Sequence, residues 1–150
     1  MSASLLDTNV WVAATFTSHP YHAASMDVLR VAKPSQPALI CRATELGFLR
    51  LITSARLVTH YGATGMTNRH ALAALSGLKT QPGIKWADEP LDAVPLWHRL
   101  ADRETASSKV WMDAYLAAFA IAGRLHFVTL DADFKTYEAH GLQLALLTPS

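Results

Sequence analysis

Short apolar runs alternate with helix-like segments along almost the whole chain, and this alternation restricts the fold more than any other feature. The predicted strands cover residues 5–6, 38–41, 84–86, 125–130 and 142–147. Helical spacing or capping signals predict helices over residues 10–14, 20–32, 42–52, 67–78, 91–103 and 111–122. Residues 53–56 are expected to end the third helix, and residues 61–65 to form a loop. Strands that alternate with helices are typical of an α/β fold with a mostly parallel, doubly covered sheet.

Length and composition exclude several classes of protein. The 150 residues contain no repeat or long linker, so we expect one domain over residues 1–150. A hydrophobic content of 51% with a net charge of only +1 excludes a disordered chain. The lone Cys41 excludes a disulfide framework and favours a cytoplasmic location. We expect no membrane helix and no signal peptide.

Only 12 residues are acidic, so their positions are informative. Asp7 follows the first predicted strand, and Glu45 lies in the first turns of the helix after the second. Asp113 opens the apolar stripe of its helix, whereas Asp131 directly follows the strand that ends at Leu130, with Asp133 two residues later. The carboxyl ends of parallel strands meet at one edge of a sheet, so these acids should converge there. Each has an ordinary alternative role, as a helix cap, a first-turn acid or a turn residue.

Clustered carboxylates repel one another, and this repulsion raises their pKa values unless a cation neutralises them. Ligand sets made only of oxygen suit Mg²⁺ or Mn²⁺. A group of acids that holds such an ion against a phosphate is typical of metal-assisted phosphodiester hydrolysis. The acids therefore predict a phosphodiesterase site, provided that the fold prediction holds.

Four segments resemble the sequence motifs of PIN-domain nucleases, in the same order and with similar spacing. They are Leu5-Leu6-Asp7-Thr8-Asn9, Thr44-Glu45-Leu46-Gly47-Phe48-Leu49-Arg50, residues 112–120 around Asp113, and residues 127–134 around Asp131. The stretch from Phe48 to Arg56 is similar to a subgroup of VapC-type toxins of bacterial toxin–antitoxin pairs. The resemblance implies a three-layer α/β/α sandwich with a mostly parallel central sheet of four to five strands. It also implies a Mg²⁺-dependent endoribonuclease, with Mn²⁺ as the other candidate ion.

The resemblance also carries roles over to individual positions. The implied catalytic residues are Asp7, Glu45, Asp113 and Asp131. Of these, Asp7, Asp113 and Asp131 would hold the metal, whereas Glu45 would act through water or position the nucleophile. Supporting polar residues would be Asn9, Thr129 and Asp133. The chain departs from the family at Met112, where many members have Thr or Ser, and so loses a hydrogen bond near the third acid.

Basic and apolar residues near the acids suggest partners. Residues that could bind the RNA backbone, or could be ordinary surface charges, are Arg42, Arg50, Lys109 and Lys135. Setting the five acids aside leaves seven against 13 Lys and Arg, a charge of +6 for the rest of the chain. Trp111, next to Asp113, could stack a base or belong to the core, whereas Trp86, Trp97 and Tyr115 are expected to be core residues.

The resemblance implies three partners, namely an RNA substrate, a small antitoxin bound over the acidic groove, and a second copy in a homodimer. Met26, Val28, Leu29, Leu46 and Leu49 could form a partner groove, a dimer seam or simply core. Two other functions stay open from the sequence. One is a PIN-domain nuclease of RNA processing or repair, and the other is a non-catalytic binding module.

Overall fold

A five-stranded sheet forms the centre of the molecule in a computed structural model that describes residues 3–149. Its strands are β1 (Ser4–Leu6), β2 (Ala38–Ile40), β3 (Ile84–Trp86), β4 (His126–Thr129) and β5 (Gln143–Leu146). All are parallel, in the order β3-β2-β1-β4-β5. β1 is central, and the strand order reverses there. The predicted parallel sheet is confirmed.

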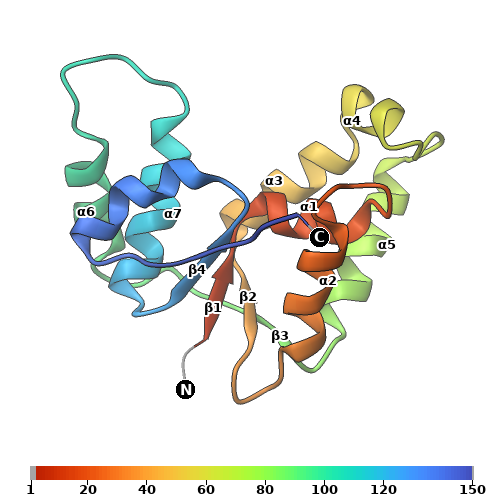
Figure 1. Ribbon diagram of the computed structural model, residues 1–150, viewed down its shortest axis with the longest axis horizontal. Coiled ribbons are helices and arrows are strands. Elements are labelled where there is room, and N and C mark those ends of the chain that lie inside the picture. The colour runs from red at the N-terminus through yellow and green to blue at the C-terminus, as the bar shows by residue number, and fades with distance from the viewer. Residues whose placement is uncertain (1–2, 150) are drawn as a thin grey trace.

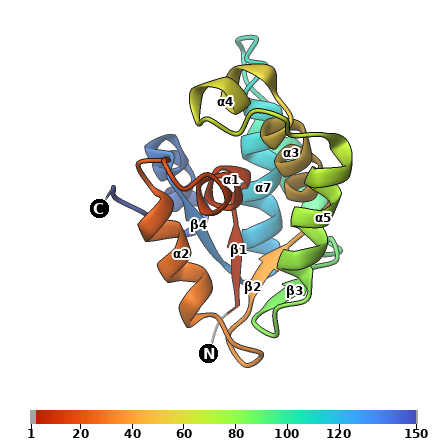
Figure 2. The ribbon, with the colours of Figure 1, turned by 90° about the vertical axis from the view of Figure 1, so that its right-hand side faces the viewer.

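Helices cover both faces of this sheet and make three layers (Figure 1, Figure 2). One face carries α1 (Thr8–Thr15), α2 (His22–Val31), α3 (Arg42–Ile52) and α5 (Asn68–Lys79), with the short α4 (Ala55–His60) at its edge. The opposite face carries α6 (Ala93–Ala101), α7 (Val110–Ala122) and the 3₁₀ segment η1 (Ala132–His140). The predicted α/β/α sandwich is therefore confirmed.

Successive strand residues point to opposite faces, as the pleat requires. Leu5 packs into the core under α7, whereas Leu6 packs into the core under α1 and α3. On β4, Phe127 likewise packs on the α7 side and Val128 on the α1 side. All four of these side chains are at most 5% exposed. The strands are apolar on both faces because both faces are covered.

Capping and close packing fix where the helices begin. The Asp7 side chain caps α1, and Thr67 caps α5 through the backbone N–H of His70. α3 packs against the start of α1 at Gly47. A Cβ atom at that position would lie 2.7 Å from the Thr8 hydroxyl oxygen, so this contact requires glycine.

Two segments differ from the sequence prediction. α4 follows Ser54 where the chain was expected to end a helix, and none of its residues is buried, so no apolar stripe marks it. η1 follows Asp131 where only a turn was expected, because short 3₁₀ segments leave no period-3.6 pattern.

The apolar residues considered for a partner groove divide between core and surface. Val28, Leu29 and Leu49 pack against the core, whereas Met26 and Leu46 are 43% and 54% exposed. The predicted core role therefore applies to the first three side chains only.

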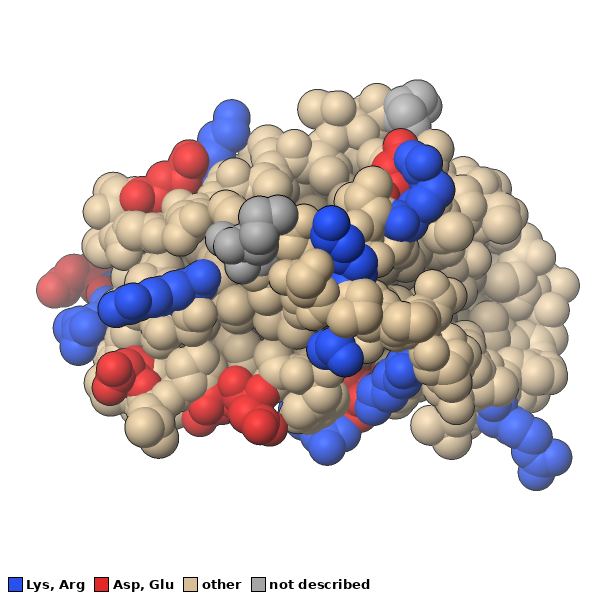
Figure 3. Space-filling view, turned by 90° about the horizontal axis from the view of Figure 1, so that it is seen from below, with Lys and Arg blue, Asp and Glu red and all other residues tan. Residues whose placement is uncertain are grey.

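None of the helices within residues 3–149 is both long and apolar enough to span a membrane. The face from which the strands start carries Lys, Arg, Asp and Glu side chains that are interspersed among uncharged residues (Figure 3). A single basic field does not cover that face, so its charges give no reason to place a polyanion there.

Candidate active site

The predicted acids meet at the carboxyl edge of the sheet, where the strand order reverses around β1. Asp7 directly follows β1, and Asp131 follows the neighbouring β4 after one intervening residue. Asp113 lies in the first turn of α7, and Asp133 lies in the first turn of η1. This is the position at which open parallel sheets bind their ligands.

Asp7 is the most buried of these four aspartates and is held from two sides. One carboxylate oxygen accepts a hydrogen bond from the backbone N–H of Thr8 at 2.7 Å. The other accepts one from the hydroxyl of the fully buried Thr129, also at 2.7 Å. Burial raises the pKa of Asp7 to about 6, although these two hydrogen bonds lower it and repulsion from Asp113 and Asp131 raises it. The carboxylate is therefore fixed in place, but the two hydrogen bonds only partly offset the cost of burying its negative charge.

Thr129 links Asp7 to Asp131 and to Asn9. Its hydroxyl oxygen accepts hydrogen bonds from the backbone N–H of Asp131 at 3.1 Å and from the Asn9 side-chain amide at 3.4 Å. The Asn9 side-chain oxygen accepts one in turn from the backbone N–H of Leu130 at 3.4 Å. These contacts join the start of α1 to the end of β4, and so fix Asp7 relative to Asp131.

Lys109 stands among the remaining three acids. Its ammonium group donates to Asp131 at 2.8 Å and to Asp133 at 2.7 Å, and lies 3.5 Å from Asp113. Hydrogen bonds to Asp131 and Asp133 raise the pKa of Lys109, so the ammonium keeps its proton. Lys109 was predicted to bind the RNA backbone, but here its charge is engaged by the acids.

The same ammonium sets the ionisation of its neighbours. Burial raises the pKa of Asp113, and the charge of Lys109 only partly offsets this increase. Burial also acts to raise the pKa of Asp131, but hydrogen bonds from Lys109 and from the Asp133 backbone outweigh it and lower that pKa. Asp131 is therefore ionised at neutral pH, and Asp7 and Asp113 are the acids that a further cation would stabilise most.

Glu45 lies at the same edge of the sheet, but its carboxylate is paired elsewhere. It forms ion pairs with Arg42, three residues before it, and with Lys79 at the end of α5. Its side chain is only 8% exposed. The structure therefore brings Asp7, Asp113, Asp131 and Asp133 into one group, whereas Glu45 belongs to a second group with two cations.

The first group suits a divalent cation by its donor chemistry. All of its donors are carboxylate oxygens, which Mg²⁺ and Mn²⁺ prefer. Asp7 is buried and makes no ion pair among residues 3–149, so its charge lacks a partner. As placed here, no three His, Cys, Asp or Glu side chains within the described residues are close enough to hold an ion together. The Lys109 ammonium supplies the positive charge between Asp113, Asp131 and Asp133 instead.

Of the other predicted RNA-binding residues, Arg50 and Lys135 are exposed, on α3 and η1. The sequence did not single out Lys79, because only the packing of α5 against α3 brings it to Glu45. The pairing of Lys109 with Asp113 could have been found, since the two residues are four apart at the start of one helix.

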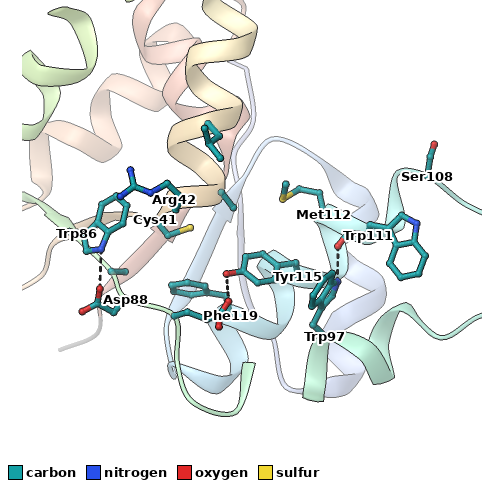
Figure 4. Close-up of a pocket in the computed structure, with 14 residues that line it drawn as sticks. Cys41, Arg42, Trp86, Asp88, Trp97, Ser108, Trp111, Met112, Tyr115 and Phe119 are labelled. Atoms are coloured by element: carbon teal, nitrogen blue, oxygen red, sulfur yellow. Dashed lines mark hydrogen bonds between the residues drawn. The ribbon is translucent and has the colours of Figure 1, made fainter. Parts of the chain in front are cut away.

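An apolar hollow of about 680 Å³ opens beside the acids, between α3, β3, α6 and α7 (Figure 4). Trp86 and Trp111, considered as core residues, lie on its wall with 40% and 59% of their surfaces exposed. Met112, next to Asp113, is also exposed there. Tyr115 and Glu89 also line the hollow, and the Tyr115 hydroxyl donates a hydrogen bond to the Glu89 carboxylate at 2.6 Å. The hollow thus adjoins the acidic group along α7.

Comparison with known proteins agrees with this arrangement. A family model described as "PIN domain" matches residues 4–139. Ribonuclease VapC41 of Mycobacterium tuberculosis is 39% identical over 144 residues, which cover 95% of this chain and 97% of the relative. Ribonuclease VapC31 of the same organism is 28% identical over 134 residues, which cover 89% of this chain and 92% of the relative.

Solved structures share the fold at low sequence identity. VapBC2 of Rickettsia felis, solved with a DNA fragment of its promoter, has a TM-score of 0.66 at 18% identity and covers 96% of this chain and 98% of its own. VapC20 of M. tuberculosis, described as a toxin that cleaves the sarcin–ricin loop, has a TM-score of 0.63 at 17% identity and covers 97% and 99%. The chain therefore belongs to the PIN-domain family and, within it, to the VapC ribonucleases.

Proposed function

We propose that this protein is a divalent-metal-dependent endoribonuclease that acts in the cytoplasm as the toxin of a toxin–antitoxin pair. The observation that carries the proposal is the buried, poorly compensated Asp7 carboxylate beside Asp113 and Asp131. The 39% identity to Ribonuclease VapC41 supports RNA as the substrate. The complete set of four motif acids argues against a non-catalytic binding module.

Asp7, Asp113 and Asp131 are the residues that would hold Mg²⁺ or Mn²⁺. Such an ion, when bound, lowers the pKa of a coordinated water and stabilises negative charge on the phosphate. Thr129 and the Thr8 backbone orient Asp7 so that its oxygens keep one direction. Lys109 holds its proton at Nζ, keeps the pKa of Asp131 low, and fixes the positions of the Asp131 and Asp133 side chains. These contacts hold the acids together in one group, and the Lys109 ammonium would move away from Asp113 and Asp131 when a metal ion binds there.

The Asp7→Asn variant tests this activity. It should lose Mg²⁺-dependent cleavage of total RNA and relieve growth arrest on expression, while it keeps the circular dichroism of the native fold. Asp27→Asn is the matched control, because Asp27 is an exposed acid of α2 that forms an ion pair with Arg30 on the surface. If Asp7→Asn still cleaved RNA in a Mg²⁺-dependent manner, Asp7 would not be part of the site.

We also propose two protein partners, an antitoxin and a second copy of the chain. The structures of VapBC pairs from R. felis and Haemophilus influenzae contain such a two-protein system, which supports the antitoxin. The hollow beside the acids supports it further, because Leu46 and Trp111 present apolar surface on opposite sides of it. Co-purification with the product of a neighbouring short reading frame tests the first partner, and light scattering tests the second. Failure to find an antitoxin would favour a role in RNA processing or repair.

A further inference from the structure

A second group of charged residues lies on the β3 side of the sheet, and the acidic site does not use it. We call Arg42, Glu45, Lys79 and Trp86 the basic cluster. Glu45 is buried at its centre, between Arg42 at the start of α3 and Lys79 at the end of α5. The two basic side chains are 67% and 40% exposed, so they reach solvent while their charged ends are anchored.

The charges of this cluster do not cancel. Glu45 contributes one negative charge against the positive charges of Arg42 and Lys79, and Lys85 lines the same hollow. A carboxylate that is already paired with two cations is a poor ligand for a third, because a metal ion would have to displace at least one of these ion pairs from the buried Glu45 carboxylate. Glu45 is thus better placed to orient Arg42 and Lys79 than to hold a metal ion.

Trp86 gives the cluster a defined shape. The Arg42 guanidinium carbon lies 4.7 Å from the ring centroid, and the Lys79 ammonium lies 5.1 Å from it. The indole N–H donates to Asp88 at 3.1 Å, which fixes the ring. Figure 4 shows Arg42 against the Trp86 ring. Two cations held over one aromatic ring form a preorganised site, whereas free surface lysines would not.

The surroundings favour a small anion rather than an apolar ligand. A hollow of about 300 Å³ is lined by Ile40, Arg42, Lys79, Ile84, Lys85 and Trp86. Three of its six lining residues are cationic, and an aromatic ring stands beside them. A phosphate with a neighbouring base combines the two chemistries that such a surface recognises.

We propose that the basic cluster binds a phosphate of the single-stranded RNA next to the cleaved bond, and that Glu45 is its positioning residue. The proposal rests on the ribonuclease function proposed above. It gives Lys79 a role in substrate binding, and it assigns Glu45 to the substrate rather than to the metal.

The location of the cluster suits this role. α3 carries both Arg42 and Glu45 in its first turn, and it packs through Gly47 against Thr8, the residue after Asp7. Figure 4 places Arg42 and Trp86 on one side of the larger hollow and Met112 on the other, on the α7 helix that carries Asp113. RNA that crosses this hollow from the acids reaches the basic cluster.

The first experiment measures RNA affinity without cleavage. In the Asp7→Asn background, Lys79→Met and Arg42→Met are titrated against a short fluorescein-labelled single-stranded RNA of mixed sequence over a range of NaCl concentrations. Each variant should raise the Kd several-fold and reduce the slope of log Kd against log salt by about 0.7, the value for one lost phosphate contact. Lys33→Met removes the same charge from the loop before β2, whereas Arg42 follows the end of that strand, and it should leave the slope unchanged.

The second experiment separates the two roles of Glu45. The Mn²⁺ affinity of each single variant is measured by calorimetric titration. The affinity of Glu45→Gln should lie within about twofold of the native affinity, whereas that of Asp113→Asn should be at least about tenfold weaker. The increase in the Kd for RNA caused by Lys79→Met should be smaller in a protein that already carries Glu45→Gln. Substitutions at contacting residues that act together do not have additive effects. Thermal unfolding confirms that each variant is folded.

The outcomes separate this proposal from the function on which it rests. If native protein bound neither Mn²⁺ nor RNA, the ribonuclease function would fail. If Asp113→Asn lost Mn²⁺ but Glu45→Gln lost it equally, Glu45 would be a metal ligand and the positioning role would be wrong. If Lys79→Met and Arg42→Met left RNA binding unchanged but altered the oligomeric state or antitoxin retention, the cluster would be a protein interface.

Discussion

Replacing Asp7 by Asn should stabilise the metal-free protein even though it removes a residue of the active site. Burial raises the pKa of Asp7 from 3.8 to about 6 in the folded chain. Below about pH 4 the carboxyl group is protonated in both states. Between about pH 4 and pH 6 the folded state keeps a proton that the unfolded state has lost, so stability falls as the pH rises. Above about pH 6 the full cost of the buried charge is present.

The size of the effect follows from the pKa shift. Each unit corresponds to about 1.4 kcal/mol, so the charged carboxylate costs roughly 3 kcal/mol of folding free energy above about pH 7. Asn avoids this cost and can still accept the Thr8 N–H, but its amide nitrogen cannot accept the Thr129 hydroxyl. The lost hydrogen bond costs about 1 kcal/mol. The net gain is therefore about 2 kcal/mol, or an increase in Tm of roughly 4–8 °C for a chain of this length.

Thermal unfolding in EDTA at about pH 8 and about pH 4 measures the effect, with Asp27→Asn as the control for an exposed acid. Asp7→Asn should melt above the native protein at the higher pH, and the difference should disappear or reverse at the lower one. Added Mn²⁺ should raise the Tm of the native protein and leave that of the variant almost unchanged, since binding stabilises only a competent folded state. An Asp7→Asn protein that melted lower than native at about pH 8 in EDTA would refute the reasoning.

Three further substitutions test the surrounding contacts. Lys109→Met should tighten Mn²⁺ binding in calorimetry, because it removes a cation held by Asp113, Asp131 and Asp133; weaker binding would mean that Lys109 supports the ion. Thr129→Val removes the hydroxyl that donates to Asp7, so it should raise the pKa of Asp7, shift the cleavage pH profile upward and cost about 1–3 kcal/mol in urea unfolding. An unshifted profile would show that the hydroxyl does not influence ionisation. Gly47→Ala should destabilise the fold by about 1–3 kcal/mol because its Cβ meets Thr8, whereas Gly77→Ala, with open space on α5, should stabilise it by about 0.5–1 kcal/mol. Equal effects of the two substitutions would contradict the close contact between α3 and α1.

Local patterns were enough to predict the sheet and most of the acidic site. Asp7 and Asp131 each come just after an apolar strand, and parallel strands end at one edge, so their proximity follows from position along the chain. The register that pairs Leu6 with Val128 is what brings the two acids together.

The pairing of side chains could not be predicted in the same way. Glu45 lies in the first turn of the helix that follows β2, which placed it at the same edge of the sheet, but its partner Lys79 belongs to a helix that is distant in the sequence. The exposed sides of Trp86 and Trp111 also depend on which helices pack beside them. α4 lacks buried residues, so no periodic signal could mark it.

The hydrogen bond between Thr129 and Asp7 also affects when the protein becomes a nuclease during its own synthesis. The two residues are 122 positions apart, and β1 must pair with β4 before that bond can form. A ribosome makes the chain from its N-terminus, so Asp7 leaves the ribosome long before Thr129 and Asp131 are available. The acidic site therefore stays incomplete on the nascent chain, and an interrupted translation product that ends before β4 has no assembled site. In this way the central position of β1 delays the activity until nearly all of the polypeptide has been made.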